Sequence, residues 1–171
     1  MSAAPKGLTL PIWTVAAAKA ATEVLLGKVF VSQQDIFLPD SNRILNVVVD
    51  SAAPIEGGAK AMAISHCDPG EILDITRGLE IWTYVQLKEI ELINSREEIE
   101  LIDSWLFLVA GLGVGKYEST GDFCLSEFAL NLLNCNIRKL VPIGYFLQIE
   151  VVFPNGKKLA ERTSNKAFGV V

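Results

Sequence analysis

The order of hydrophobic and polar positions predicts a helix near the N-terminus of the chain. Residues 11–26 place apolar side chains on one face at helical spacing, namely Ala17, Ala20, Ala21, Val24 and Leu25. Pro11 suits the first turn of a helix, and Gly27 suits its end. Because alanine dominates the apolar face, we expect this helix to lie close against a sheet.

After this helix the chain changes to short runs rich in β-branched residues, which predict strands. The candidate strands are residues 29–31, 36–38, 44–49, 60–65, 79–93, 106–109 and 145–153. Turn-forming sequences at 39–42 and 154–156 predict a hairpin between the second and third candidates and an end to the last one. Within 79–93, the alternation predicts one buried face, formed by Ile81, Thr83, Val85 and Leu87.

A second helix is predicted at residues 123–140, with an apolar stripe formed by Leu125, Phe128, Ala129, Leu132 and Leu133. Helices and strands do not alternate as strictly as in a doubly wound sheet, and strands predominate. The pattern therefore predicts an α+β fold with a mainly antiparallel or mixed sheet and helices packed on one face. We expect residues 1–171 to form a single domain.

Composition and charge narrow the classes of function. The net charge is −5, and the chain lacks the stripe of lysine and arginine that is typical of nucleic-acid binders. No apolar run has the length of a membrane span, and the nearest, residues 11–26, contains Lys19 and Glu23. The N-terminus lacks the layout of a secretory signal. We therefore expect no nucleic-acid partner, no membrane and a cytoplasmic location.

The three cysteines and the single histidine do not have the spacing of a zinc site. His66 and Cys67 are adjacent and would be at most a fragment of one, while Cys124 and Cys135 lie far along the chain. We therefore expect reduced thiols in a reducing compartment and no protein-bound metal.

Residues 110–117, AGLGVGKY, raise the question of a phosphate-binding loop. Only three residues separate Gly111 from Gly115, and a tyrosine follows Lys116, so the segment does not match a P-loop. Its Gly-x-Gly-x-Gly spacing also differs from the dinucleotide-binding motif. Two interpretations remain: backbone N–H groups that line an anion site, or a turn in which glycine only relieves crowding.

A second cluster, residues 66–78, carries three carboxylates on one short connection, namely Asp68, Glu71 and Asp74. These groups could bind a cation, or one of them could act as a base. Alternatively, the segment is a solvated loop with turn-forming aspartates. A third cluster, residues 158–166, offers basic and amide donors just before the apolar end of the chain.

Taken in order, four segments resemble the motifs of one known family. They are KGLTLP at residues 6–11 with the alanines that follow, DPGEILDITRG at 68–78, GLGVG at 111–115 and LAERTSNKAFG at 159–169. They are similar to the opening, the acidic loop, the Gly-x-Gly-x-Gly motif and the closing Ala-x-x-Thr-x-Asn motif of the CbiD family, the cobalt-precorrin-5B C(1)-methyltransferases. The chain departs from the usual motifs at Glu71 and Ile72, where two aspartates are common, and at Tyr117 and Glu118, where threonines are common.

The resemblance implies an enzyme of anaerobic cobalamin biosynthesis. Such an enzyme transfers a methyl group from S-adenosylmethionine to ring carbon C-1 of cobalt-precorrin-5B, a cobalt-containing corrin precursor. The family usually continues into a Rossmann-like C-terminal domain, so this chain would correspond to the N-terminal domain. We expect the S-adenosylmethionine site in that other domain or in a split partner chain. The alternative is a truncated, non-catalytic domain that binds a tetrapyrrole or a partner chain.

The resemblance, together with the hydrogen-bond donors in these motifs, indicates a set of site residues. The expected substrate-binding residues are Lys6, Thr9, Lys19, Gly111, Gly113, Gly115, Lys116, Arg162, Thr163 and Asn165. Asp68 and Asp74 are the candidates for a catalytic carboxylate. We further expect the acidic and glycine segments on the same side of the sheet, and an exposed apolar patch with Phe168 and Val170. A Gly113→Val substitution is expected to impair corrinoid binding and to leave the fold intact.

Overall fold

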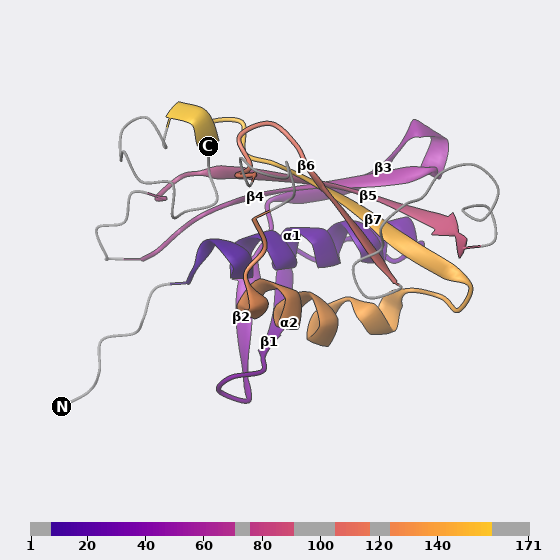
Figure 1. Cartoon of the computed structure of the whole chain (residues 1–171), viewed down its shortest axis with the longest axis horizontal. Helices are drawn as coiled ribbons and strands as arrows, with labels where there is room; N and C mark the ends of the chain where they lie inside the picture. The colour runs from indigo at the N-terminus through magenta and orange to yellow at the C-terminus, as the bar shows by residue number, and fades with distance from the viewer. Residues whose placement is uncertain (1–7, 71–75, 91–104, 117–123, 159–171) are drawn as a thin grey trace.

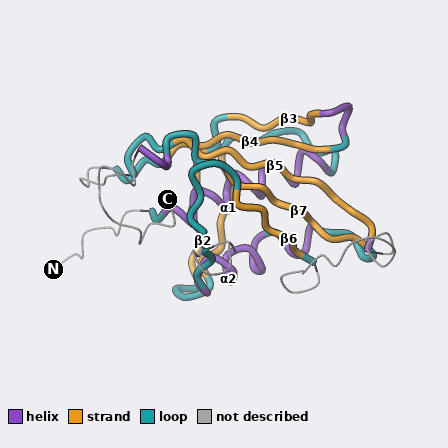
Figure 2. Tube along the Cα trace, turned by 45° about the horizontal axis from the view of Figure 1, so that its top comes forward, coloured by secondary structure: helices purple, strands orange, loops and turns teal. Residues whose placement is uncertain are grey.

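The computed structural model describes residues 8–70, 76–90, 105–116 and 124–158. Within these residues the chain forms two α-helices, a five-stranded sheet and a separate two-stranded sheet (Figure 1). Both α-helices lie on the same side of the five-stranded sheet (Figure 2). The α+β class predicted from the sequence is therefore confirmed, together with the packing of helices on one face.

The five-stranded sheet has the order β3-β4-β5-β7-β6. Its strands are β3 (Ser51–Ile55), β4 (Lys60–His66), β5 (Glu80–Glu89), β6 (Leu106–Ala110) and β7 (Tyr145–Val152). Neighbouring strands are antiparallel except β6 and β7, which are parallel. The sheet is therefore mixed and mainly antiparallel, as predicted.

Alternation along the strands gives the sheet a core face and an outer face. On β5, Ile81, Thr83 and Val85 are buried, whereas the residues between them are only partly buried. The core face continues on the neighbouring strands with Ala61, Ala63, Leu147, Ile149 and Val151. The buried face predicted for residues 79–93 is confirmed at these positions, although Leu87 is only partly buried.

Helix α1 (Leu10–Leu25) packs on the core face of the sheet, against β3, β4 and β5. It begins as predicted, with Thr9 in an extended conformation before it and Pro11 in its first turn. Five of its alanines are at most 1% exposed, namely Ala16, Ala17, Ala18, Ala20 and Ala21. Because each carries only a methyl group, these positions allow the helix to approach the strands closely, and Ile12, Trp13, Val15 and Val24 are its larger buried side chains.

Helix α2 (Glu127–Asn136) connects the parallel strands β6 and β7, so the three elements form a βαβ unit. Ser126 caps the helix, because its hydroxyl accepts a hydrogen bond from Ala129 N at 3.1 Å. The helix is shorter than the predicted 123–140, and the chain continues in a 3-10 turn, η3 (Arg138–Leu140). Helix α2 packs against α1 rather than directly on the centre of the sheet.

Strands β1 (Gln33–Leu38) and β2 (Arg43–Val48) form the predicted hairpin, with the turn at residues 39–42. Residues 29–31, which the sequence predicts as a strand, form a loop instead. Val29 and Val31 are 89% and 57% exposed. β-branched residues favour a strand only where a neighbour pairs with them, and none of the described strands pairs with this segment.

The sequence does not predict strand β3, because SAAPI contains alanine and proline in place of the usual β-branched residues. The strand lies at the edge of the sheet and pairs with β4 alone. An edge position tolerates Pro54, since one side of an edge strand has no ladder that needs its missing N–H group. Pairing with β4 thus decides the conformation of a segment whose own preference is weak.

Asn136, the last residue of α2, fastens the β1–β2 hairpin to the core. Its side chain is 4% exposed, and its Oδ1 accepts a hydrogen bond from Phe37 N at 2.7 Å. Its Nδ2 donates to Phe37 O and to Leu132 O, both at 2.9 Å. The buried amide therefore satisfies both backbone groups of one residue in β1.

We expect Asn136→Ala to lower the free energy of unfolding by about 2–4 kcal/mol, because it leaves the N–H and C=O groups of Phe37 without their partner. Urea denaturation measures this change. Asn46→Ala is the matched control, since Asn46 makes an exposed hydrogen bond to Asp35 in the same hairpin. The control should cost no more than about 0.5 kcal/mol, and equal losses in the two variants would contradict the role of Asn136.

The loop after β6 folds back against the end of β7. Gly111 N donates to Val151 O at 2.8 Å, and a Cβ on Gly111 would lie only 2.6 Å from the same oxygen. Gly113 has a φ of +76°, and a Cβ there would lie 2.1 Å from Phe153 O. Both glycines are therefore required by backbone packing. The expectation that Gly113→Val leaves the fold intact is wrong.

We expect Gly113→Ala to lower the free energy of unfolding by about 2–5 kcal/mol, from its left-handed backbone and from the overlap with Phe153 O. The matched control is Gly144→Ala, because Gly144 has a φ of +86° but nothing within 4 Å of a Cβ. The control should lose only about 1–2 kcal/mol in the same denaturation experiment. A smaller loss for Gly113→Ala than for the control would refute the packing argument.

Candidate functional site

The directions of the strands bring two of the predicted clusters together. Strands β4 and β7 are both antiparallel to β5, and β6 is parallel to β7. The C-terminal ends of β4, β6 and β7 therefore all lie at the same end of the sheet. The acidic loop (residues 67–78) follows β4, and the glycine loop (residues 111–116) follows β6. The expectation that the two loops lie on the same side is therefore confirmed for their described residues, which in the acidic loop are 67–70 and 76–78 (Figure 1). We call this end of the molecule the loop edge.

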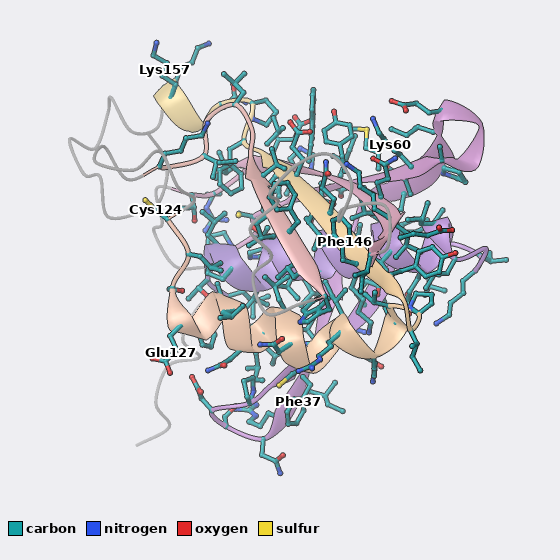
Figure 3. The ribbon with its side chains drawn as sticks, turned by 45° about the vertical axis from the view of Figure 1, so that its right-hand side comes forward. Phe37, Lys60, Cys124, Glu127, Phe146 and Lys157 are labelled. Atoms are coloured by element: carbon teal, nitrogen blue, oxygen red, sulfur yellow. The ribbon has the colours of Figure 1, made fainter. Side chains whose placement is uncertain are left out.

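Two further segments reach the loop edge. Helix α1 begins at this end in Figure 1, and the exposed Thr9 directly precedes it. The chain after β7 makes a turn in which Gly156 N donates to Phe153 O at 2.9 Å, and the exposed Lys157 follows it (Figure 3). The loop edge thus collects described parts of the opening, acidic and glycine segments, together with Lys157 and Lys158, which precede the closing motif.

Within the glycine loop the exposed cation is Lys116, whereas Gly113 and Gly115 are buried. The crowding of Gly111 and Gly113 against β7 supports the interpretation of a tight turn at these two positions. Any ligand at this edge would therefore meet lysine side chains sooner than glycine N–H groups.

Asp68, one of the two catalytic candidates, is a turn-forming residue. Its Oδ1 accepts a hydrogen bond from Gly70 N at 3.0 Å and lies 3.7 Å from Arg77 Nη1. Its side chain is 74% exposed. This arrangement matches the alternative of a solvated loop, and it lacks the burial that makes a carboxylate an effective base.

Lys19 is placed away from the loop edge. It lies in the middle of α1, roughly 13 Å along the helix from its first residue. Its Nζ donates to Asp35 O in β1 at 2.7 Å, and partial burial lowers the pKa of the ammonium. Lys19 therefore fastens the hairpin to α1 and is not brought together with the glycine loop.

The remaining predicted site residues lie outside the described residues. They are Lys6, Asp74, Arg162, Thr163 and Asn165. The apolar residues Phe168 and Val170, expected to form an exposed patch, also lie outside them.

The outer face of the sheet carries a cavity of about 330 Å³ that the sequence does not predict. Its lining includes Trp82, Tyr84, Gln86, Gln148 and Glu150. Burial, and then the nearby Glu150 carboxylate, raise the pKa of Tyr84. The sequence contains one signal of this cavity, because two aromatic residues lie on the more polar face of the strand predicted at 79–93. That signal alone does not distinguish a cavity from a half-buried surface.

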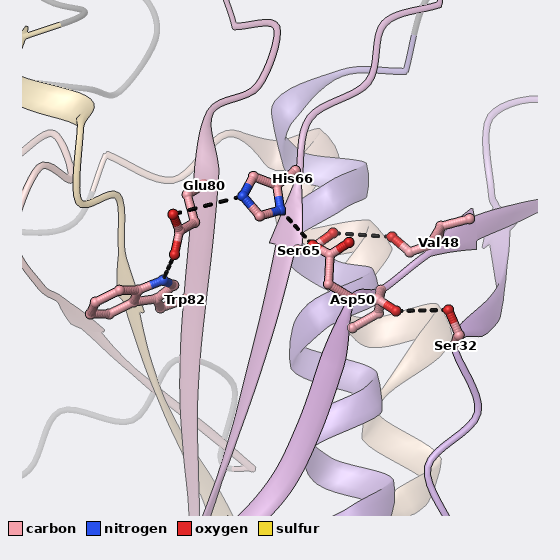
Figure 4. Close-up of polar contacts among 8 residues, drawn as sticks. Ser32, Val48, Asp50, Ser65, His66, Glu80 and Trp82 are labelled. Atoms are coloured by element: carbon pink, nitrogen blue, oxygen red, sulfur yellow. Dashed lines mark hydrogen bonds and ion pairs between the residues drawn. The ribbon is translucent and has the colours of Figure 1, made fainter.

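A second unpredicted feature is a chain of polar contacts across three neighbouring strand ends (Figure 4). His66 Nδ1 lies 2.5 Å from Asp50 Oδ2, and His66 Nε2 lies 3.7 Å from Glu80 Oε2. The other oxygen of Glu80 accepts a hydrogen bond from Trp82 Nε1. The contacts join residues 50, 66 and 80, which are far apart in sequence and come together only through strand pairing.

The described residues contain no cluster of three or more His, Cys, Asp or Glu side chains that could hold a metal ion. The three cysteines form no disulfide with one another. In the same described part of the chain, no helix is long and apolar enough to span a membrane.

Comparison with curated proteins finds close relatives. The chain is 54% identical over 164 residues to a protein of Prochlorococcus marinus (strain MIT 9313) named cobalt-precorrin-5B C(1)-methyltransferase, covering 96% of this chain and 42% of that protein. A protein of the same name from Synechococcus sp. (strain CC9902) is 47% identical over 165 residues, with the same coverage of the two chains. The chain therefore spans about two-fifths of the length of these relatives.

A solved structure shares the fold. It is the crystal structure of the cobalamin biosynthesis protein CbiD from Archaeoglobus fulgidus, with a TM-score of 0.57, 21% sequence identity, and coverage of 96% of this chain and 49% of that chain. The family model named CbiD matches residues 2–171, which is almost the whole chain. The motifs, the fold and this match agree, and the chain belongs to the CbiD family.

Proposed function

We propose that this chain is the N-terminal domain of a cobalt-precorrin-5B C(1)-methyltransferase. In the complete enzyme it would take part in methylating C-1 of cobalt-precorrin-5B in anaerobic cobalamin biosynthesis, in the cytoplasm, with S-adenosylmethionine as donor. The family and the names of its relatives support the reaction. The convergence of the acidic and glycine loops at the loop edge is the observation that supports a site in this domain.

The substrate is expected to carry many carboxylates, so its binding needs local cations. The chain has a net charge of −5 and cannot attract such an anion as a whole. The exposed lysines at the loop edge are Lys116, Lys157 and Lys158, which can make charge-assisted hydrogen bonds to carboxylates. We infer that these lysines, together with Thr9, hold the periphery of the corrin precursor.

The methyl donor is already electrophilic, so the main task of the enzyme is alignment of the sulfonium with the ring carbon. Such alignment can contribute about 7–11 kcal/mol at best. The chain has no phosphate-binding or dinucleotide-binding motif. We therefore propose that the C-terminal domain of the complete enzyme binds S-adenosylmethionine, and that residues 1–171 alone do not catalyse methyl transfer.

Isothermal titration of the 171-residue chain with S-adenosylmethionine tests the location of the donor site. We expect no heat of binding at micromolar concentrations, because the proposed donor site belongs to the other domain. The complete enzyme, titrated under the same conditions, is the positive control. A micromolar site on the isolated chain would contradict the proposed location.

In the complete enzyme, Lys116→Ala should weaken the binding of cobalt-precorrin-5B by about 1–3 kcal/mol, because one charge-assisted hydrogen bond is lost. Optical titration of the corrinoid gives the Kd. Lys28→Ala is the control, since Lys28 is exposed, follows the opposite end of α1 and pairs with Glu23 at 3.3 Å. An unchanged Kd for Lys116→Ala would refute the role of Lys116. Corrinoid binding by the complete protein without methyl transfer would favour the non-catalytic alternative.

A further inference from the structure

The only histidine of the chain is held between two carboxylates at the end of β4. Its Nδ1 lies 2.5 Å from Asp50 Oδ2, a distance that requires a shared proton, so in the neutral ring Nδ1–H donates to Asp50. Its Nε2 lies 3.7 Å from Glu80 Oε2, beyond hydrogen-bond distance. The side chain is 47% exposed. The imidazole is therefore about half exposed, and its Nε2 faces Glu80 without being hydrogen-bonded to it.

The pair is fixed by its surroundings. Asp50 N donates to Ile64 O at 2.9 Å, which anchors the chain just before β3 to β4. Ser65, the residue before His66, donates its hydroxyl to Val48 O at 3.1 Å (Figure 4). The charged groups that face the imidazole are Asp50 on one side and Glu80, from β5, on the other. An aspartate that orients a half-exposed histidine through Nδ1, with Nε2 beyond hydrogen-bond distance of Glu80, is the arrangement of a general base.

His66 and Asp50, which we call the dyad, lie beside the cavity of the outer face. Cα pairing aligns His66 with Glu80, and the Glu80 carboxylate also accepts the indole N–H of Trp82. Trp82 lines the cavity, so one carboxylate contacts both the dyad and the cavity wall. His66 directly precedes the acidic loop, which places the dyad at the loop edge.

Methyl transfer from a sulfonium to a neutral carbon nucleophile releases one proton. The S–CH₃ bond breaks with its electron pair left on sulfur as a neutral thioether, and a pair from the macrocycle forms the new C–C bond. An N–H or C–H proton of the macrocycle must then leave, and its bonding pair returns to the ring. We propose that His66 Nε2 accepts this proton, with Asp50 as the positioning residue that orients the imidazole through Nδ1. This inference rests on the proposed function.

Two substitutions in the complete enzyme separate a base from a structural ion pair. His66→Asn keeps an amide donor that can reach Asp50 but has no basic nitrogen, and Asp50→Asn leaves the imidazole without its carboxylate. For a base, His66→Asn should lower kcat by about 10²–10⁴-fold with little change in KM, and should remove the acidic limb of the kcat–pH profile. Asp50→Asn should also lower kcat. Thermal unfolding should show both variants folded.

The isolated chain supplies an independent readout, because its single histidine gives one set of imidazole signals. Nitrogen-15 NMR should show the neutral ring protonated at Nδ1, and the opposite tautomer would overturn the geometry of the dyad. A folded His66→Asn enzyme with normal kcat and an intact acidic limb would overturn the base while leaving the proposed function standing. A complete wild-type enzyme that transfers no methyl group would overturn the proposed function and the base with it.

Discussion

The close contact between the alanine face of α1 and the core face of the five-stranded sheet is the constraint on which the rest of the structure depends. The methyl groups on this face are almost fully buried, and small side chains allow a helix to lie nearer to the strands than leucines would. Helix α2 and the β1–β2 hairpin then pack around the sides of α1. Because Thr9 directly precedes α1, the position of this helix determines where Thr9 lies at the loop edge.

Much of this fold follows from the sequence because its patterns are local. The alanine face of 11–26, the alternation at 79–93 and the turn at 39–42 each specify their element over a few residues. Two errors have the same origin. Val29 and Val31 have a preference for strands but no neighbour to pair with, while SAAPI has little preference and becomes a strand by pairing with β4. Pairing between distant segments is not encoded in a short window.

The candidate site likewise combines features that local sequence predicts with contacts between distant segments that it does not predict. The expectation that the acidic and glycine loops lie on one side is confirmed for their described residues by the strand directions. The sequence does not reveal that Gly111 and Gly113 pack against the end of β7, because that contact joins residues some 40 positions apart. Nor does it single out His66, whose neighbours Asp50 and Glu80 lie 16 and 14 positions away. A histidine next to a cysteine suggests metal binding, and only the pairing of β4 with β3 and with β5 reveals its carboxylate partners.

The amide of Asn136 closes a contact with Phe37 across 99 positions of the chain. Closing a loop of this length costs conformational entropy, which the buried hydrogen bonds of Asn136 help to offset. The backbone proton of Phe37 is then released to solvent only when the hairpin detaches from α2. Hydrogen exchange at this one amide would therefore report the opening of the contact between the hairpin and α2, as distinct from the unfolding of the large sheet.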